Sequence, residues 1–247
     1  MTQQVNQGTP IKKGPNTILI FALFGIIALI ILIAMLTSNR NIDLSGFTSS
    51  SGHGAPEQTE FQSPPAPIVT GRDHKRGAAN PVMTVIEYGD FECPFCKKFH
   101  PTLSSFLAAN VEEVQVIYRQ LPLHIHELAR EKAHASECAA ELGGEAAFWQ
   151  YHDMLYDRAD ANGLGISLSD LPTFAAELGI EEAAFNTCMA SGKHYPRIDI
   201  DVSGATAAGI SGTPTSVIIA NDGSGTVIPG TIPTEGLESI LSTIKGL

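Results

Sequence analysis

A strand that leads directly into a cysteine pair at the start of a helix is the feature that most constrains this 247-residue chain. The pair is Cys93 and Cys96, in the stretch Cys-Pro-Phe-Cys. Residues 82–88 before it are apolar and rich in strand formers, whereas apolar residues from Leu103 onward recur at helical spacing. Cys93 is therefore expected where a helix begins.

That position makes a thiol reactive. The first backbone N–H groups of a helix have no partner within it and the helix dipole is positive there, so both stabilise a thiolate at Cys93. Pro94 suits the first helical position, where its missing N–H costs nothing. Cys96 lies one turn further on the same face, close enough to form a disulfide with Cys93. We expect an accessible, nucleophilic Cys93 and a resolving Cys96.

A second constraint is the uncharged apolar run 18–36. Its ~19 residues give roughly 28 Å of helix, which matches a hydrocarbon core of about 30 Å. Lys12 and Lys13 precede it and only Arg40 follows closely, which favours residues 1–17 in the cytoplasm and the rest outside. A cleaved signal peptide is the alternative, but the run exceeds the usual apolar core and no Ala-x-Ala site follows. The sequence predicts a single-pass membrane anchor.

The composition of the chain beyond the apolar run limits the kinds of partner it can bind. Beyond Arg40 the chain carries 12 basic and 26 acidic residues, a formal charge of −14, which disfavours nucleic acid as a partner. Residues 37–80 are rich in Ser, Gly, Pro and Gln and are expected to form a flexible linker. All four cysteines follow the run 18–36, as suits an oxidising compartment.

The folded domain is expected over residues 81–247. Residues 114–121 alternate apolar and polar and predict a strand parallel to the first, in a strand-helix-strand unit. Helical patterns follow at 127–142, 145–156, 168–178, 181–191 and 195–208. Strands at 215–220 and 226–228 and an amphipathic helix carrying Leu237, Ile240, Leu241 and Ile244 complete the chain.

Three features together resemble the DsbA-like thiol:disulfide oxidoreductases of the thioredoxin superfamily. They are the Cys93–Cys96 motif after a strand, Gly-Thr-Pro-Thr at 212–215 before a late strand, and Phe-Trp-Gln-Tyr-His-Asp at 148–153. The resemblance covers about residues 81–247. It implies an α/β thioredoxin fold with a helical insertion at about 127–208, preceded here by the predicted transmembrane helix.

The resemblance also assigns roles to individual residues. Thr213–Pro214 is expected to form a cis peptide that faces the cysteine pair, keeps metals away and leaves the Thr213 backbone free to pair with an extended client. Glu87, six residues before Cys93, matches the buried acid that moves protons to and from the inner cysteine. Burial would raise its pKa, although an ordinary solvated glutamate at a strand end is the alternative.

Phe95 departs from the family pattern, in which the best-known members have a histidine that stabilises the outer thiolate. The loss of this cation should make the disulfide less oxidising. Lys97 and Lys98 are candidates to replace part of the charge, or are simply solvated surface lysines. By analogy with some members, Cys138 and Cys188 form a structural disulfide, which would stabilise the fold by about 4 kcal/mol. A second redox-active pair is the alternative.

Histidines near the motif raise one other possibility. Cys93 and Cys96 could form a soft-metal site with His100, His124 and His126. However, the sequence does not place the last two histidines near the pair, so no metal and no cofactor is expected. No nucleotide-binding or nucleophile-elbow motif is present.

The sequence thus predicts a membrane-tethered oxidoreductase acting on extracytoplasmic, cysteine-containing clients. Disulfide formation would pass through a mixed disulfide at Cys93. The resemblance implies re-oxidation by a quinone-linked membrane partner of the DsbB or VKOR type. Two alternatives stay open: a reductase or isomerase of the same fold, and a non-catalytic module that holds clients or delivers a metal.

Overall fold

The computed structural model describes residues 68–246. The predicted cytoplasmic segment 1–17, the anchor 18–36 and residues 37–67 of the linker lie outside the described residues. Within 68–246, no helix combines the length and the apolar character that crossing a bilayer requires.

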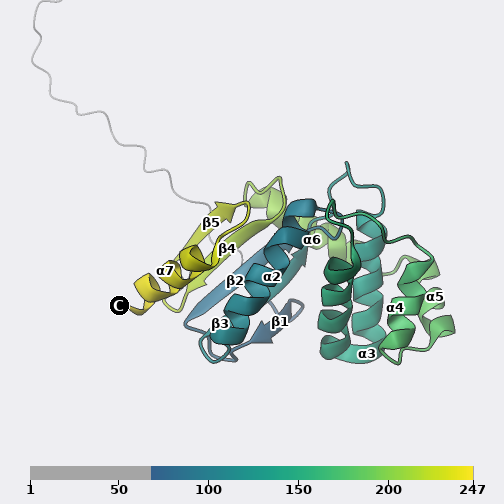
Figure 1. Ribbon diagram of the computed structural model, residues 1–247, viewed down its shortest axis with the longest axis horizontal. Coiled ribbons are helices and arrows are strands. Elements are labelled where there is room, and N and C mark those ends of the chain that lie inside the picture. The colour runs from purple at the N-terminus through teal and green to yellow at the C-terminus, as the bar shows by residue number, and fades with distance from the viewer. Residues whose placement is uncertain (1–67, 247) are drawn as a thin grey trace, which may run out of the picture. The chain divides into compact units, whose positions relative to one another are not determined.

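One five-stranded sheet forms the centre of the domain, in the order β1-β3-β2-β4-β5 (Figure 1). The strands are β1 His74–Gly77, β2 Met83–Gly89, β3 Val114–Gln120, β4 Thr215–Ala220 and β5 Gly225–Pro229. β2 and β3 are parallel, which confirms the predicted strand-helix-strand unit, and the other neighbours are antiparallel. The central strand β2 carries Glu87, whose register partners are Tyr118 in β3 and Ser216 in β4.

Helices cover both faces of this sheet. They are α2 Pro94–Ala109, α3 Ala129–Arg158, α4 Asp170–Glu177, α5 Glu182–Ser191, α6 Tyr195–Ala207 and α7 Thr234–Lys245. Figure 1 shows α2 and α7 on one face, α6 on the other, and α3, α4 and α5 beside the sheet. The predicted helical insertion is confirmed and consists of α3 to α6. Its first two predicted helices form one element, α3, that is broken at Gly144, where a φ of +79° interrupts the helix.

The start of the folded domain was predicted wrongly. Residues up to 80 were expected to be linker, yet β1 at His74–Gly77 joins the sheet as an edge strand against β3. Its sequence, His-Lys-Arg-Gly, has no apolar alternation because its side chains make polar contacts. His74 lies 3.1 Å from Glu137 and 2.9 Å from Glu145, both in α3. Ion pairing at an edge leaves no hydrophobic signal in a sequence.

Two hydrophobic clusters lie on opposite faces of the sheet. The larger joins β2, β3, α2, α3, α4, α5 and α7, and includes Cys93 and Cys96 as well as Cys138 and Cys188. The smaller contains Ile86, Tyr88, Ile117 and Val217 from the strands and Ala205 from α6. The residues of β2 therefore alternate between two cores, which holds the end of this strand, and the loop that follows it, in a fixed position.

Replacing Phe106 in α2 tests how strongly this core holds the helix. Phe106 is 1% exposed, so Phe106→Ala should lower the free energy of unfolding by about 3–5 kcal/mol through lost burial and a residual cavity. Phe95→Ala, in the same helix but at a side chain that is 63% exposed, is the matched control. Guanidinium titration of both variants measures the difference, and equal losses would contradict this packing.

Candidate active site

The cysteine pair lies where α2 begins. Cys93 has extended backbone angles, φ −78° and ψ 119°, and is the residue that caps the helix, while Pro94 is the first helical residue, as predicted. The Cys93 N–H donates to the carbonyl of Asp90 at 3.0 Å, and the Cys93 carbonyl accepts from the N–H of Lys97 at 3.1 Å. These bonds leave the Cys93 side chain facing the unpaired N–H groups of the first turn.

The two thiols differ strongly in acidity. The pKa of Cys93 falls from 9.0 to about 6, mainly because the Cys96 thiol donates a hydrogen bond to it, with further help from the backbone N–H groups of Cys96 and Phe95 and against the opposing effect of burial. Burial instead raises the pKa of Cys96 well above 9.0, and the hydrogen bond to Cys93 adds to this. At neutral pH the pair therefore holds one thiolate, on Cys93, and one thiol, on Cys96.

Glu87 lies within the sheet behind the pair. It is 3% exposed, and its Oε1 has no hydrogen-bond partner among the described residues. Burial raises its pKa from 4.5 to about 8; the nearby Arg76 opposes the shift, while negative charge on Cys93 adds to it. Glu87 also contributes to the raised pKa of Cys96, so the two groups are close enough to interact. Glu87 is thus a protonated carboxyl at neutral pH.

The loop before β4 faces Cys93. Thr213–Pro214 is a cis peptide bond. The Cys93 sulfur lies 3.3 Å from the Thr213 carbonyl oxygen, to which the thiol form donates. A hollow of about 280 Å³ adjoins this loop and is lined by residues from 209–215 and from β5. The structure therefore brings Cys93, Cys96, Glu87, Thr213 and Pro214 together, as the family resemblance implies.

Access to the sulfur differs from the expectation. Cys93 was predicted to be accessible but is only 3% exposed. Gly163, with a φ of +79°, packs against the backbone of this segment so closely that a Cβ there would lie 2.2 Å from the Glu92 carbonyl oxygen. The 160–166 loop thus packs against the backbone of Cys93, and the Thr213 carbonyl lies against its sulfur. The neighbouring Phe95 instead projects into solvent, beside a hollow of about 540 Å³ that also involves Pro101 and Tyr156.

A buried charge network fixes the segment before Cys93, and sequence reasoning missed it. Asp90 accepts from the N–H of Leu123 at 2.7 Å and pairs with His126 at 2.7 Å. Glu92 pairs with Lys132 of α3 at 2.8 Å, and both side chains are almost fully buried. The sequence does show two acidic residues, Asp90 and Glu92, directly before Cys93, and these could have indicated a charged contact. Nothing in the sequence identified Lys132 as the partner.

Two of the histidines considered as metal ligands, and Lys97 as a replacement cation, have other partners. His126 pairs with Asp90, His124 is exposed, and His100 lies 3.8 Å from Asp153. Within residues 68–246, no cluster of three metal-ligating side chains includes Cys93 or Cys96. Lys97 donates to the Tyr156 carbonyl at 2.6 Å. Its ammonium group is therefore engaged with α3.

The remaining cysteines are joined. A disulfide links Cys138 in α3 to Cys188 in α5, 50 residues apart in sequence. Both residues are buried in the larger core, whereas Cys93 and Cys96 are free thiols. The bridge ties together two helices of the insertion.

Glu87→Gln tests the raised pKa of the buried acid. Between about pH 4.5 and 8 the folded protein retains a proton on Glu87 that the unfolded chain has released, so stability falls as the pH rises through this window. Relative to Glu87→Gln, the free energy of unfolding of the unmodified protein should fall by about 1.4 kcal/mol per pH unit there. Denaturant titrations from pH 4 to 9 measure this, and a pH-independent difference would show an ordinary carboxyl.

Cys96→Ala tests the main cause of the Cys93 acidity. Since the Cys96 thiol supplies the largest stabilisation of the Cys93 thiolate, this variant should titrate at a clearly higher pH than the value of about 6 in the unmodified reduced protein. Thiolate absorbance and the rate of alkylation, each followed against pH, report the midpoint. Phe95→Ala, which keeps the backbone N–H groups, serves as a control. An unchanged midpoint in Cys96→Ala would assign the acidity to the helix terminus alone.

Part of the chain is similar to much longer proteins. It is 37% identical over 150 residues to the Na(+)/H(+) antiporter NhaA 3 of Salinispora tropica and 36% identical over 150 residues to NhaA 1 of Salinispora arenicola. Each match covers 60% of this chain but only 22% of the relative. The chain thus spans about a fifth of the length of these curated relatives.

Matches over the whole domain identify the family. The model of a thioredoxin family matches residues 69–241. The structure of Pseudomonas aeruginosa DsbA2 is similar with a TM-score of 0.62 and 31% identity, over 72% of this chain and 97% of that one. Bacillus subtilis BdbD shares the fold at 20% identity, with a TM-score of 0.63 over 74% and 97% of the two chains. The chain therefore belongs to the DsbA-like family of thiol:disulfide oxidoreductases in the thioredoxin superfamily.

Proposed function

We propose that this protein forms disulfide bonds in extracytoplasmic proteins through the Cys93–Cys96 pair. The observation that carries the proposal is the asymmetry of the two thiols, with a pKa of about 6 at Cys93 and one well above 9.0 at Cys96. A sulfur that is easily ionised is a good leaving group in thiol–disulfide exchange. Cys93 therefore releases a bound client readily.

The reaction begins from the oxidised pair. A client thiolate attacks the Cys93 sulfur, forms a mixed disulfide and displaces Cys96 as a thiolate. Because Cys96 is buried and its pKa is raised, it must take up a proton, and the protonated Glu87 is the nearby acid that supplies it. A second client thiolate then attacks the client sulfur of the mixed disulfide. Cys93 leaves as a thiolate, and the client has lost two electrons to the pair.

The direction of exchange depends on the redox potential. Stabilising the Cys93 thiolate favours the reduced pair and makes the disulfide more oxidising, by about 30 mV for each 1.4 kcal/mol. Phe95 supplies no positive charge to this thiolate, and Lys97 is bonded to a carbonyl of α3. A potential near about −120 mV would support oxidation of clients, and one near about −270 mV would favour reduction.

The proposed location and redox partner of the protein are inferred from its sequence. The apolar run 18–36 would tether the domain to the membrane with residues 1–17 in the cytoplasm. The reduced pair would then need an electron acceptor, and a quinone-linked membrane protein of the DsbB or VKOR type is the proposed partner. The hollow beside Thr213 and Pro214 is the proposed client-binding surface.

Two cysteine variants test the reaction in an oxidative-refolding assay with a reduced, unfolded client. Cys93→Ser should lose essentially all activity, because the attacked sulfur is gone. A stoichiometric mixed disulfide between Cys96→Ala and a client variant with a single cysteine should be stable, because neither Cys96 nor a second client thiol can attack it, and the adduct should appear on a non-reducing gel. The double variant Cys138→Ala/Cys188→Ala, which leaves the pair intact, is the control. Full activity of Cys93→Ser would support a non-catalytic client-holding module instead.

A further inference from the structure

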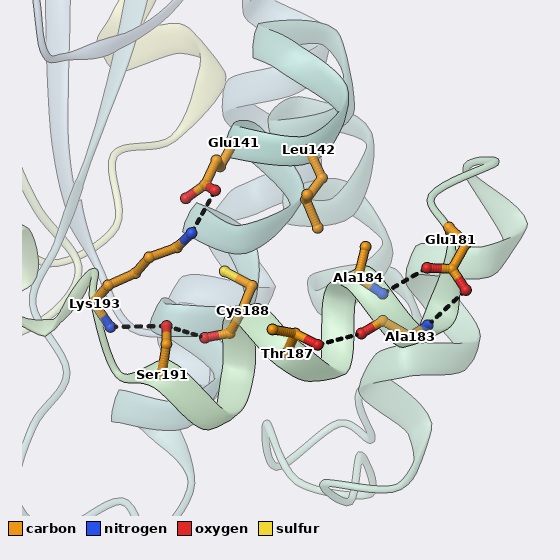
Figure 2. A pocket seen from close by; sticks show the side chains of 9 residues that line it. All are labelled: Glu141, Leu142, Glu181, Ala183, Ala184, Thr187, Cys188, Ser191 and Lys193. Atoms are coloured by element: carbon orange, nitrogen blue, oxygen red, sulfur yellow. Dashed lines mark hydrogen bonds and ion pairs between the residues drawn. The ribbon is translucent and has the colours of Figure 1, made fainter.

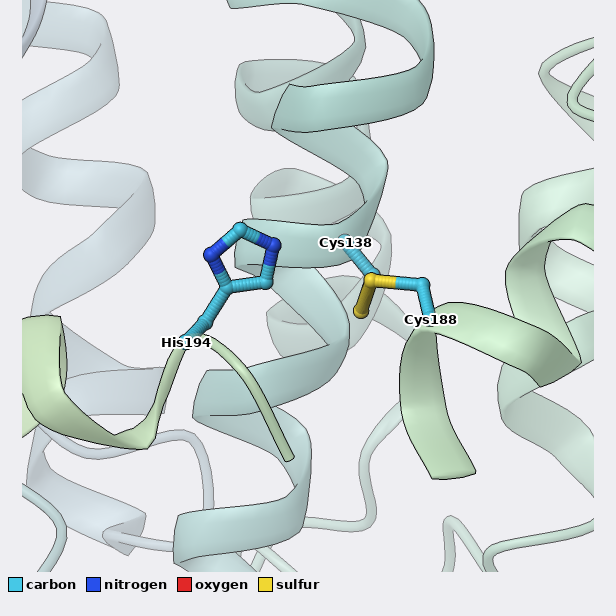
Figure 3. A group of neighbouring side chains, drawn as sticks. All are labelled: Cys138, Cys188 and His194. Atoms are coloured by element: carbon cyan, nitrogen blue, oxygen red, sulfur yellow. A yellow bond between two sulfur atoms is a disulfide. The ribbon is translucent and has the colours of Figure 1, made fainter. Parts of the chain in front are cut away.

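A second group of metal-ligating side chains surrounds the Cys138–Cys188 disulfide. One potential ligand atom from each of Cys138, Cys188 and His194 lies within 4.8 Å of the others. The three residues come from α3, from α5 and from the residue that precedes α6, and Figure 3 shows the imidazole facing the two sulfurs. This group lies outside the Cys93 site, and the sequence analysis did not predict it because His194 is not near either cysteine in a recognisable motif.

Further donors adjoin the three. His134 is fully buried; its Nε2 lies 3.2 Å from the Cys188 carbonyl oxygen and 3.8 Å from the Cys138 sulfur, so it would exchange the carbonyl contact for a metal, and its Nδ1 has no hydrogen-bond partner among the described residues. Its ring centroid lies 5.5 Å from that of His194. Glu141 Oε2 lies 2.9 Å from His194 Nε2. A carboxylate beside an imidazole is the usual environment of a histidine that binds a metal.

The site has a route from solvent. A hollow of about 490 Å³ lies over α5 and is lined by Cys188, Glu141, Lys193 and neighbouring residues (Figure 2). Lys193 pairs with Glu141 across its edge. The hollow therefore leads from solvent to Cys188, while Cys138 lies fully buried behind it.

We infer that, once its disulfide is reduced, the Cys138–Cys188 pair binds a Zn²⁺ ion together with His194, with His134 as the nearest candidate for the fourth ligand. Two cysteines with two histidines form one of the common tetrahedral zinc sites. Two thiolates neutralise the charge of the dication, so the buried site acquires no net charge. Two sulfurs bound to one zinc lie about 3.8 Å apart, and the Cα atoms of the two cysteines, 5.9 Å apart, allow that separation.

The chemistry couples metal binding to the redox state. A dithiol reductant transfers two electrons and two protons to the Cys138–Cys188 bond, which gives two thiols and the disulfide of the reductant. Zn²⁺ then displaces the two protons and binds the two thiolates. The oxidised pair has no thiolate to offer and cannot bind the ion in this way. The site is thus formed by reduction and removed by oxidation.

Cobalt titration of the full chain tests this inference. The background variant is Cys93→Ser/Cys96→Ser, in which Cys138 and Cys188 are the only cysteines. After reduction with a phosphine, one equivalent of Co²⁺ should produce the visible bands of tetrahedral cobalt together with thiolate-to-cobalt charge transfer, and Zn²⁺ should displace it. The same variant with its disulfide intact should show neither signal.

Two histidine variants make the test specific. His194→Ala, at a partly exposed side chain, should weaken Zn²⁺ binding by at least about tenfold. His124→Ala, at an exposed histidine that is not part of the group, should leave binding unchanged. An octahedral cobalt spectrum, binding that persists in the oxidised protein, or an unchanged affinity in His194→Ala would overturn the inference.

Far-ultraviolet circular dichroism covers the case in which reduction loosens the insertion. If the reduced protein loses helicity, Zn²⁺ should restore it, and failure to do so would also overturn the inference. None of these measurements depends on disulfide formation by Cys93, so the zinc site and the proposed function are tested separately.

Discussion

The active site of this domain depends on the stabilisation of a negative charge on the Cys93 sulfur. The Cys93 sulfur receives hydrogen bonds from the Cys96 thiol and from N–H groups of the first turn of α2, and together these lower its pKa to about 6. None of these donors carries a formal charge. The arrangement therefore depends on accurate positions rather than on a nearby cation, and it is less sensitive to salt than an ion pair would be.

Accurate positions require a rigid approach to the helix, and two features of the structure supply it. The central strand β2 packs against cores on both of its faces, so its end is fixed. Asp90 and Glu92 then hold the following turn through buried contacts with His126 and Lys132. A buried pair such as Glu92 with Lys132 adds little net stability, but the loss of either partner leaves an uncompensated charge in the core. The Glu92–Lys132 pair therefore holds the turn before Cys93 in a single conformation.

The sequence predicted those parts of the fold that depend on local or periodic signals. The apolar alternation of the strands, the proline after Cys93 and the glycines between helices identified the elements and their order. Interactions between distant polar residues left no such signal. For this reason β1 was assigned to the linker, and neither Lys132 as the partner of Glu92 nor His194 beside the Cys138–Cys188 disulfide was recognised. The burial of Cys93 was missed for a related reason, since it depends on a loop some 70 residues away in the chain.

The close packing of Gly163 over the Cys93 segment bears on which clients the proposed reaction can reach. A sulfur recessed between two loops is open to a thin, extended polypeptide but not to the convex surface of a finished protein. The site would then distinguish clients by their conformation rather than by their sequence. Unfolded chains would donate electrons to it, while the thiols of folded proteins would be left unchanged.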